Sequence, residues 1–192
     1  MKKILFANCL ALLFACELPN VENSSAKLIE GEVIMENFDS NNLLNWNIVN
    51  DSVMGGRSQA TLKLINNTYA NFKGYLSLQN NGGFSSIRAY YPPDLTNVKS
   101  IVLKVRGDGR KYNFRIRGNT GNWASYTHSF DTVEGEWNEI ELKIDDFYPV
   151  YRGYTLKNMP QLSEVIIKEI GIMLSDKIEG SFSIDIDWIM AK

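Results

Sequence analysis

Apolar and polar residues alternate along most of the chain after residue 31, which is the period of a β-strand and not of a helix. The alternation is clearest in the segments 101–106, 111–117 and 137–144. Further strands are predicted at 32–38, 44–49, 59–65, 69–78, 84–91, 124–130, 168–174 and 180–192. Because many short strands are separated by Gly, Asn, Pro and Asp, the pattern predicts one all-β sandwich, of jelly-roll type, over residues 31–192.

The pair Asp108-Gly109 joins two of these segments. A two-residue Asp-Gly link favours a type I′ turn, so segments 101–106 and 111–117 are predicted to form a hairpin. One side of that hairpin would then be basic, with Lys104, Arg106, Asn113, Arg115 and Arg117. Two interpretations stay open: pairing with Glu139 and Glu141 on a neighbouring strand, or a site for an anionic or polar partner, flanked by Tyr126 and His128.

The last segment predicts an apolar face made of Phe182, Ile184, Ile186, Trp188 and Met190. Asp185 and Asp187 share the opposite face. Together with Glu36 or Asp39 they are candidate oxygen ligands for a structural calcium ion, or else a solvated face. The sequence suggests no other cofactor.

Two glycine-rich loops carry candidate binding residues. In the loop 50–58, with the sequence NDSVMGGRS, these are Asn50, Asp51, Met54, Gly55 and Gly56. The alternative is a tight structural turn in which Met54 fills a core gap. In the loop 80–86, with the sequence NNGGFSS, Gly82 and Gly83 suggest an anion cradle. A strand and not a helix follows them, so nucleotide binding is not predicted.

The first residues are typical of an export leader. Two lysines precede an apolar run at 4–15, which is too short to span a bilayer. The run ends in LLFAC, which predicts lipidation of Cys16, with an ordinary cleaved signal as the alternative. We therefore expect a leader at 1–16, a flexible tether at 17–30, and a bacterial envelope location with a lipid anchor on the periplasmic side.

Composition narrows the chemistry. The net charge of −2 and the pI near 5.5 argue against nucleic-acid binding. Both cysteines lie in the first 16 residues, which leaves the domain without a disulfide or a thiolate zinc site. His128 is the single histidine, and no nucleophile-elbow motif accompanies it. We therefore predict that the chain is not an enzyme.

The order NDSVMGGRS, FKGYLSLQNNGGFSS, LKVRGDGRKYNFRIR, DDFYPVYRG, IGIMLSD and GSFSIDIDWI resembles the complex I intermediate-associated protein 30 family. The resemblance implies a galactose-binding-like jelly roll and an assembly role without chemistry. The family-signature residues are Asp51, Met54, Gly55, Gly56, Ser58, Gly82, Gly83, Phe84, Arg106, Gly107, Asp108, Gly109, Arg152 and Gly153.

These observations predict a non-catalytic binding or assembly module that docks on a protein partner. The alternative is a carbohydrate-binding domain of the envelope, with Trp123, Tyr126 and Tyr154 as stacking surfaces. A hydrolase that uses His128 or the pair Asp185 and Asp187 is the least favoured hypothesis. The candidate binding residues are Asn50, Asp51, Met54, Gly55, Gly56, Gly82, Gly83, Arg106, Asp108, Arg115, Arg117, Tyr126, His128 and Arg152.

Overall fold

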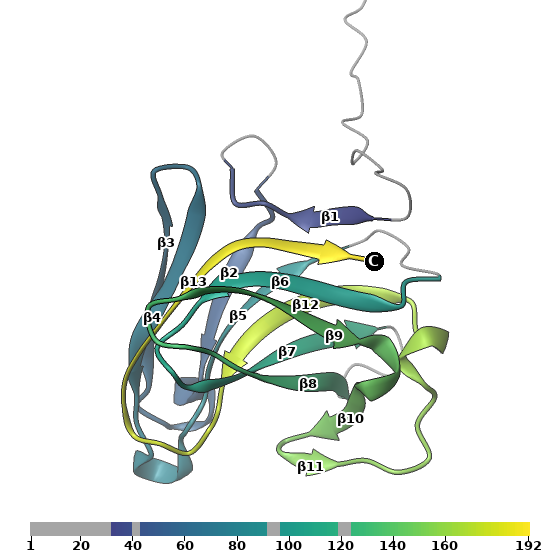
Figure 1. The fold of residues 1–192 in the computed structure, drawn as a ribbon. Helices are drawn as coiled ribbons and strands as arrows, with labels where there is room; N and C mark the ends of the chain where they lie inside the picture. Colours follow the sequence, from purple (N-terminus) through teal and green to yellow (C-terminus); the bar gives the residue numbers. More distant parts are fainter. Residues whose placement is uncertain (1–31, 40–42, 92–96, 119–123) are drawn as a thin grey trace, which may run out of the picture.

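The computed structural model describes residues 32–39, 43–91, 97–118 and 124–192 (Figure 1). The predicted leader, tether and lipidation site, together with Trp123, lie outside these residues. The described residues form two antiparallel sheets and no α-helix, with short 3-10 segments at Asp51–Met54 (η1), Gln79–Asn81 (η2), Ile144–Asp146 (η3) and Leu162–Glu164 (η4). Within them, no helix has the length and apolar character needed to cross a bilayer.

Sheet I has the order β3-β4-β13-β6-β9, with β1 also paired to β13. Its strands are β1 (Val33–Glu36), β3 (Gln59–Ile65), β4 (Tyr69–Leu76), β6 (Ser100–Arg106), β9 (Trp137–Lys143) and β13 (Gly180–Ala191). Sheet II has the order β11-β10-β8-β7-β12-β5-β2. Its strands are β2 (Trp46–Asn50), β5 (Ser85–Tyr90), β7 (Lys111–Gly118), β8 (Ser125–Asp131), β10 (Tyr148–Tyr151), β11 (Tyr154–Thr155) and β12 (Ile167–Leu174).

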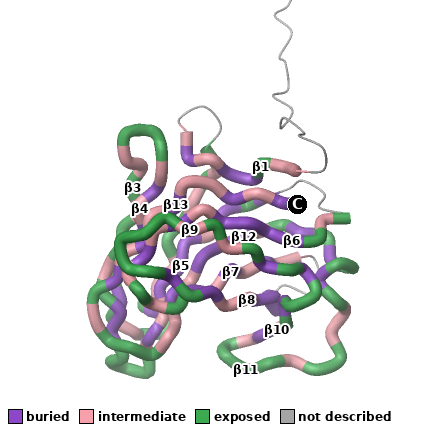
Figure 2. Tube along the Cα trace, viewed as in Figure 1, coloured by how far each residue is buried: buried purple, intermediate pink, exposed green. Residues whose placement is uncertain are grey.

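The core lies between the two sheets, where the buried segments gather in Figure 2. Successive side chains of a strand point to opposite faces, so every second residue reaches the core. Phe72 and Phe182 of sheet I meet edge to face, and Phe114 of sheet II lies fully buried. The predicted all-β sandwich is confirmed.

The predicted hairpin at Asp108-Gly109 is wrong. β6 lies between β13 and β9 in sheet I, and β7 lies between β12 and β8 in sheet II, so the link crosses from one sheet to the other. Gly109 has a positive φ of 81° and Asp108 does not, whereas a type I′ turn needs both. That geometry occurs at Arg152-Gly153, with φ values of 49° and 84°, in a β10–β11 hairpin that the alternation does not reveal.

The predicted apolar face of the last strand is only half right. The register of β13 against β6 shifts between Ile186 and Trp188, which is a bulge. A bulge moves the following residues to the opposite face. Ile189 and Ala191 are therefore buried, and Trp188 and Met190 are only partly buried.

Candidate functional site

The signature loop 50–58 is organised around the buried carboxylate of Asp51. Its oxygens accept hydrogen bonds from Ser58 N at 2.9 Å, Ser58 Oγ at 2.6 Å, Gly83 N at 2.7 Å and Phe84 N at 3.4 Å. Burial raises the pKa of Asp51, but these hydrogen bonds outweigh it and leave the pKa below its ordinary value. Asp51 thus joins the two glycine-rich loops, which are far apart in sequence. We call these residues the Asp51 cluster.

Two glycines are required by this cluster. A Cβ on Gly56 would lie 2.3 Å from Asp51 Cγ, and one on Gly82 would lie 2.6 Å from Asp51 Oδ2. The amides of Gly83 and Phe84 do hold an anion, but the anion is the protein's own Asp51. Met54 does not fill a core gap, since 63% of it is exposed. Most of this motif therefore stabilises the fold.

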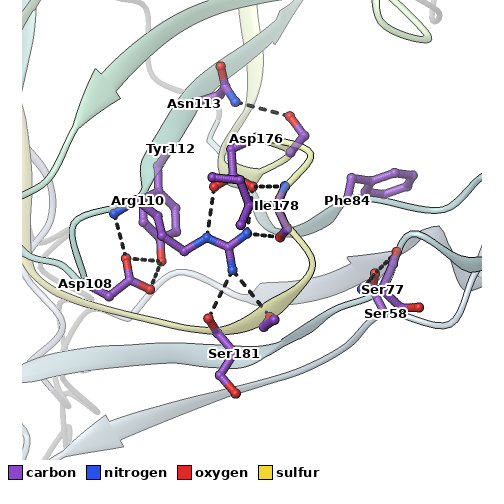
Figure 3. Close-up of polar contacts among 12 residues, drawn as sticks. Ser58, Ser77, Phe84, Asp108, Arg110, Tyr112, Asn113, Asp176, Ile178 and Ser181 are labelled. Carbon is purple, nitrogen blue, oxygen red and sulfur yellow. Dashed lines mark hydrogen bonds and ion pairs between the residues drawn. The ribbon is translucent and has the colours of Figure 1, made fainter.

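The RGDGR segment is similarly engaged at the crossing between the sheets. Arg110 forms a bidentate pair with Asp176, with Nε–Oδ2 at 2.9 Å and Nη2–Oδ1 at 2.7 Å, and also donates to Ser181 O (Figure 3). Asp108 accepts from Ser183 N at 2.7 Å and from the Tyr112 hydroxyl. We call Asp108, Arg110, Tyr112 and Asp176 the Arg110 cluster. Its charges are satisfied within the molecule, which explains the motif structurally.

The outer face of sheet I carries the first half of the predicted basic face. Lys104 Nζ lies 2.9 Å from Asp187 Oδ2, and Arg106 Nη2 lies 2.6 Å from Asp185 Oδ2. The guanidinium of Arg106 also lies 4.9 Å from the centre of the Trp137 ring. The predicted compensation by carboxylates therefore occurs, but the ion pairs are made with β13. Glu139 of β9 lies opposite Lys104 in the register, but the ion pair of Lys104 is made with Asp187.

The carboxylates suggested for calcium are not brought together. Asp185 and Asp187 are paired with cations, and Glu36 accepts from Phe38 N at 2.9 Å and Trp46 Nε1 at 2.8 Å. Within 32–39, 43–91, 97–118 and 124–192, no three His, Cys, Asp or Glu side chains are grouped as a metal site.

The outer face of sheet II holds the other half of the predicted basic face, in a cleft of about 650 Å³. We call it the arginine cleft. Five cationic side chains and one carboxylate are among the described residues that line it: Arg88, Arg115, Arg117, Arg152, Lys177 and Glu169. Hydroxyl and aromatic groups complete the lining, among them Ser86, Ser125, Thr127, Tyr148 and Tyr151. Although the net charge of the chain is −2, the described residues that line this cleft carry an excess of positive charge.

The pKa values of two arginines in the cleft are lowered. Burial, followed by repulsion from Arg88 and Arg117, lowers the pKa of Arg115 to about 10. Burial also lowers the pKa of Arg88, an effect opposed by Glu169 and increased by Arg117. Charges that destabilise one another in a cleft are typical of binding sites. The cleft is therefore the strongest candidate site.

Tyr126 and His128 do not flank the arginines, contrary to prediction. They lie opposite Ile116 and Phe114 in the register of β7 and β8, and so face the core. The Tyr126 hydroxyl donates to Pro160 O at 2.6 Å, and the His128 ring lies 5.3 Å from that of Phe147. Tyr126 and His128 do share one face of β8, but the register of that strand against β7 cannot be read from one chain.

Together with Asn113 of the predicted basic face, six of the candidate binding residues line the cleft: Met54, Gly82, Gly83, Arg115, Arg117 and Arg152. Asn50, Asp51, Gly55 and Gly56 support the loops beside it, with Asn50 Oδ1 accepting from Ser85 Oγ at 2.6 Å. Arg106 and Asp108 belong to the structural contacts described above. Sequence reasoning missed Arg88, Glu169 and Tyr148. The signal for Arg88 was available, because alternation in 84–91 places it opposite to Ile87 and Ala89.

Comparison with known proteins identifies the family of this chain. The sequence model of the complex I intermediate-associated protein 30 family matches residues 36–186. The chain belongs to this family. It is 27% identical, over 182 aligned residues, to the mitochondrial complex I intermediate-associated protein 30 of Mus musculus, covering 83% of this chain and 56% of the mouse protein. It is 30% identical over 98 residues to a probable Caenorhabditis elegans member, covering 48% of this chain and 29% of that protein.

The chain therefore spans about half the length of the mouse relative and less of the nematode one. Among solved structures, it resembles a family 11 carbohydrate-binding module of Clostridium thermocellum in complex with a β-1,3-1,4-mixed-linked tetrasaccharide. The TM-score is 0.63 at 17% identity, covering 84% of this chain and 95% of the module. An agarase matches with a TM-score of 0.59 at 10% identity, covering 85% of this chain and 25% of the agarase. These likenesses concern the fold, and they confirm the predicted jelly-roll sandwich.

Proposed function

We propose that this chain is a non-catalytic binding module that docks on a protein partner through the arginine cleft. The single observation that carries the proposal is the excess of cationic side chains in that cleft. On the outer face of sheet I, by contrast, Lys104 and Arg106 are both paired with carboxylates. Membership of the family supports an assembly-related role. The name of the mouse relative describes a protein associated with intermediates of complex I, and here we propose the same kind of association.

Two features support the absence of catalysis in this proposal. His128, the single histidine, faces the core beside Phe147 and lies away from the cleft. The paired aspartates on β13 are bound to Arg106 and Lys104. We further propose that the chain acts in the bacterial envelope, held by a lipid on Cys16, as its first residues suggest. Incorporation of radiolabelled palmitate by the wild type and not by Cys16→Ala is the test of that anchor.

The test of the docking function is a pull-down of the tagged full-length chain from gently solubilised membranes, with mass spectrometry of the captured proteins. An Arg115→Ala/Arg117→Ala double variant removes two of the five cationic side chains of the cleft, and Lys104→Ala on sheet I is the control. We expect a defined complex to be captured by the wild type and the control and lost in the double variant. Equal capture by all three, or capture of no saturable partner, contradicts the proposal.

A second candidate is glycan binding. It is favoured by one observation: the cleft lies on a sheet face lined with hydroxyl groups and with Tyr148 and Tyr151, and aromatic rings stack well on sugar faces. The solved module of the same fold, which is in complex with a tetrasaccharide, supports testing it. A glycan array with the wild type and a Tyr148→Ala variant distinguishes the two candidates. Absence of signal on the array removes the glycan hypothesis.

A further inference from the structure

The register of sheet II gathers three arginines on one side of the cleft. Gly171 of β12 lies opposite Arg88 of β5 on one side and opposite Arg115 of β7 on the other. Since neighbouring strands are spaced about 4.8 Å apart, the backbones of these two arginines are about 10 Å apart, across a position without a side chain. Glu169, two residues earlier on β12, lies opposite Arg117. A Cβ on Gly171 would lie 2.6 Å from Ile87 O and 3.3 Å from Arg88 Cγ, so the Arg88 side chain lies close beside the glycine.

The hydrogen-bond partners of Arg88 and Arg115 among the described residues are neutral, and the nearest compensating charge is the Glu169 carboxylate. Arg115 Nη1 lies 2.8 Å from Met173 Sδ, and its Nη2 contacts Ser125 Oγ. Arg88 Nε donates to Ser86 Oγ at 3.2 Å. A guanidinium has five N–H donors, so most of those on Arg88 remain without a partner in the described part of the chain. Arg117 differs, because its Nη1 lies 3.5 Å from Glu169 Oε1.

We propose that Arg88, Arg115 and Arg117 form a subsite for the carboxylates of an acidic segment of a partner protein. The inference rests on the docking function proposed above and names the chemistry that the cleft recognises. The planar fork of a guanidinium matches a carboxylate in bidentate geometry. The Arg117–Glu169 pair shows that this face already accommodates one carboxylate beside its arginines.

The distribution of charge favours an extended ligand over a compact anion. Arg152 belongs to the β10–β11 turn at one edge of sheet II. Lys177 follows β12, and its Nζ would lie 3.4 Å from a Cβ placed on Gly83, beside the start of β5. Both side chains line the same cleft as the three arginines. A single small anion would meet only part of this set, whereas an acidic peptide lying along the cleft would meet all of it.

The experiment is a titration of the full-length chain with a fluorescently labelled hexaglutamate peptide, followed by anisotropy at low and at physiological salt. We expect saturable binding at one peptide per chain, weakened at least tenfold in Arg115→Met and in Arg88→Met. Lys104→Met removes one charge from sheet I and serves as the matched control, with affinity within twofold of the wild type. Thermal melting of each variant establishes that it is folded, and the use of two cleft variants protects the test against the failure of one.

Three outcomes overturn the inference: binding of hexaglutamate no tighter than that of hexaglutamine, equal weakening in Lys104→Met, or binding of hexagalacturonate or inorganic phosphate in preference to the peptide. The galacturonate result would assign the subsite to an acidic glycan instead. Failure of the docking function is recognised separately. Capture of a partner that depends on the cleft, without hexaglutamate binding, retains the function and rejects the subsite. Hexaglutamate binding without any captured partner retains the subsite and rejects the function.

Discussion

Arg110 and Arg115 are five residues apart, and both are partly buried, but their surroundings are opposite. Arg110 forms a bidentate pair with Asp176, so its pKa is raised even though burial opposes this. Burial, followed by repulsion from Arg88 and Arg117, lowers the pKa of Arg115 to about 10, and its hydrogen-bond partners are neutral. An arginine side chain therefore stabilises the folded state at position 110 and destabilises it at position 115. Titratable groups perturbed by burial and by like charges in a cleft are frequent at functional sites.

The largest expected effect comes from breaking the Arg110 cluster. We expect Arg110→Met to lower the free energy of unfolding by about 3–5 kcal/mol, because Asp176 then remains buried without its cation. Urea unfolding monitored by tryptophan fluorescence measures this. Arg57→Met, an exposed substitution, is the control and is expected to change little. A loss below 1 kcal/mol for Arg110→Met would contradict the structural role of this pair.

The Asp51 cluster is expected to show a slightly smaller effect. Asp51→Asn replaces an accepting oxygen with a donor that faces the amides of Ser58 and Gly83, at a cost of about 2–4 kcal/mol. Because the folded-state pKa of Asp51 lies below its ordinary value of 3.8, its stabilisation is complete above that pH and is lost as the pH falls further. Urea unfolding at pH 6 and pH 3 should therefore show a weaker acid dependence in Asp51→Asn. An unchanged acid dependence would exclude this role.

The cleft is expected to respond with the opposite sign. Arg115→Met keeps much of the side-chain volume and removes the repulsion from Arg88 and Arg117, so we expect the free energy of unfolding to rise by about 0.5–1 kcal/mol. The same urea titration at pH 7 checks it. A lower free energy of unfolding in Arg115→Met would mean that Arg115, like Arg110, stabilises the fold, and would contradict this prediction.

The smallest effect belongs to the exposed pair on sheet I. Lys104 and Asp187 are each about one-third exposed, and such pairs contribute little. We therefore expect Lys104→Met to change the free energy of unfolding by less than about 0.5 kcal/mol. Raising the salt concentration in the same unfolding experiment should leave the difference from wild type almost unchanged. A larger loss would mean that the face of sheet I depends on its ion pairs.

Strand alternation was sufficient to predict most strands, because a side-chain period of two is local information. It failed where pairing decides the geometry. The Asp-Gly link appeared to close a hairpin, but β6 and β7 each have both edges occupied by other strands. In β13 a bulge interrupts the alternation without leaving a mark in the sequence.

The candidate site was predicted in part for the same reason. Arg115 and Arg117 were recognised as one basic face, since they share a strand. Arg88 and Glu169 lie on β5 and β12, whose positions beside β7 depend on the whole topology. The glycine-rich motifs were the most conspicuous sequence features, but they mainly serve the carboxylate of Asp51. Conspicuous motifs here mark the points that hold the fold together, and the cleft is assembled from ordinary strand residues.

The most direct test of the central claim is the amount of partner captured by Arg115→Met relative to wild type, at equal concentrations of folded protein. The account predicts that capture is lost in a variant that is at least as stable as the wild type. Undiminished capture by a folded Arg115→Met would contradict the claim that the arginine cleft is the binding surface.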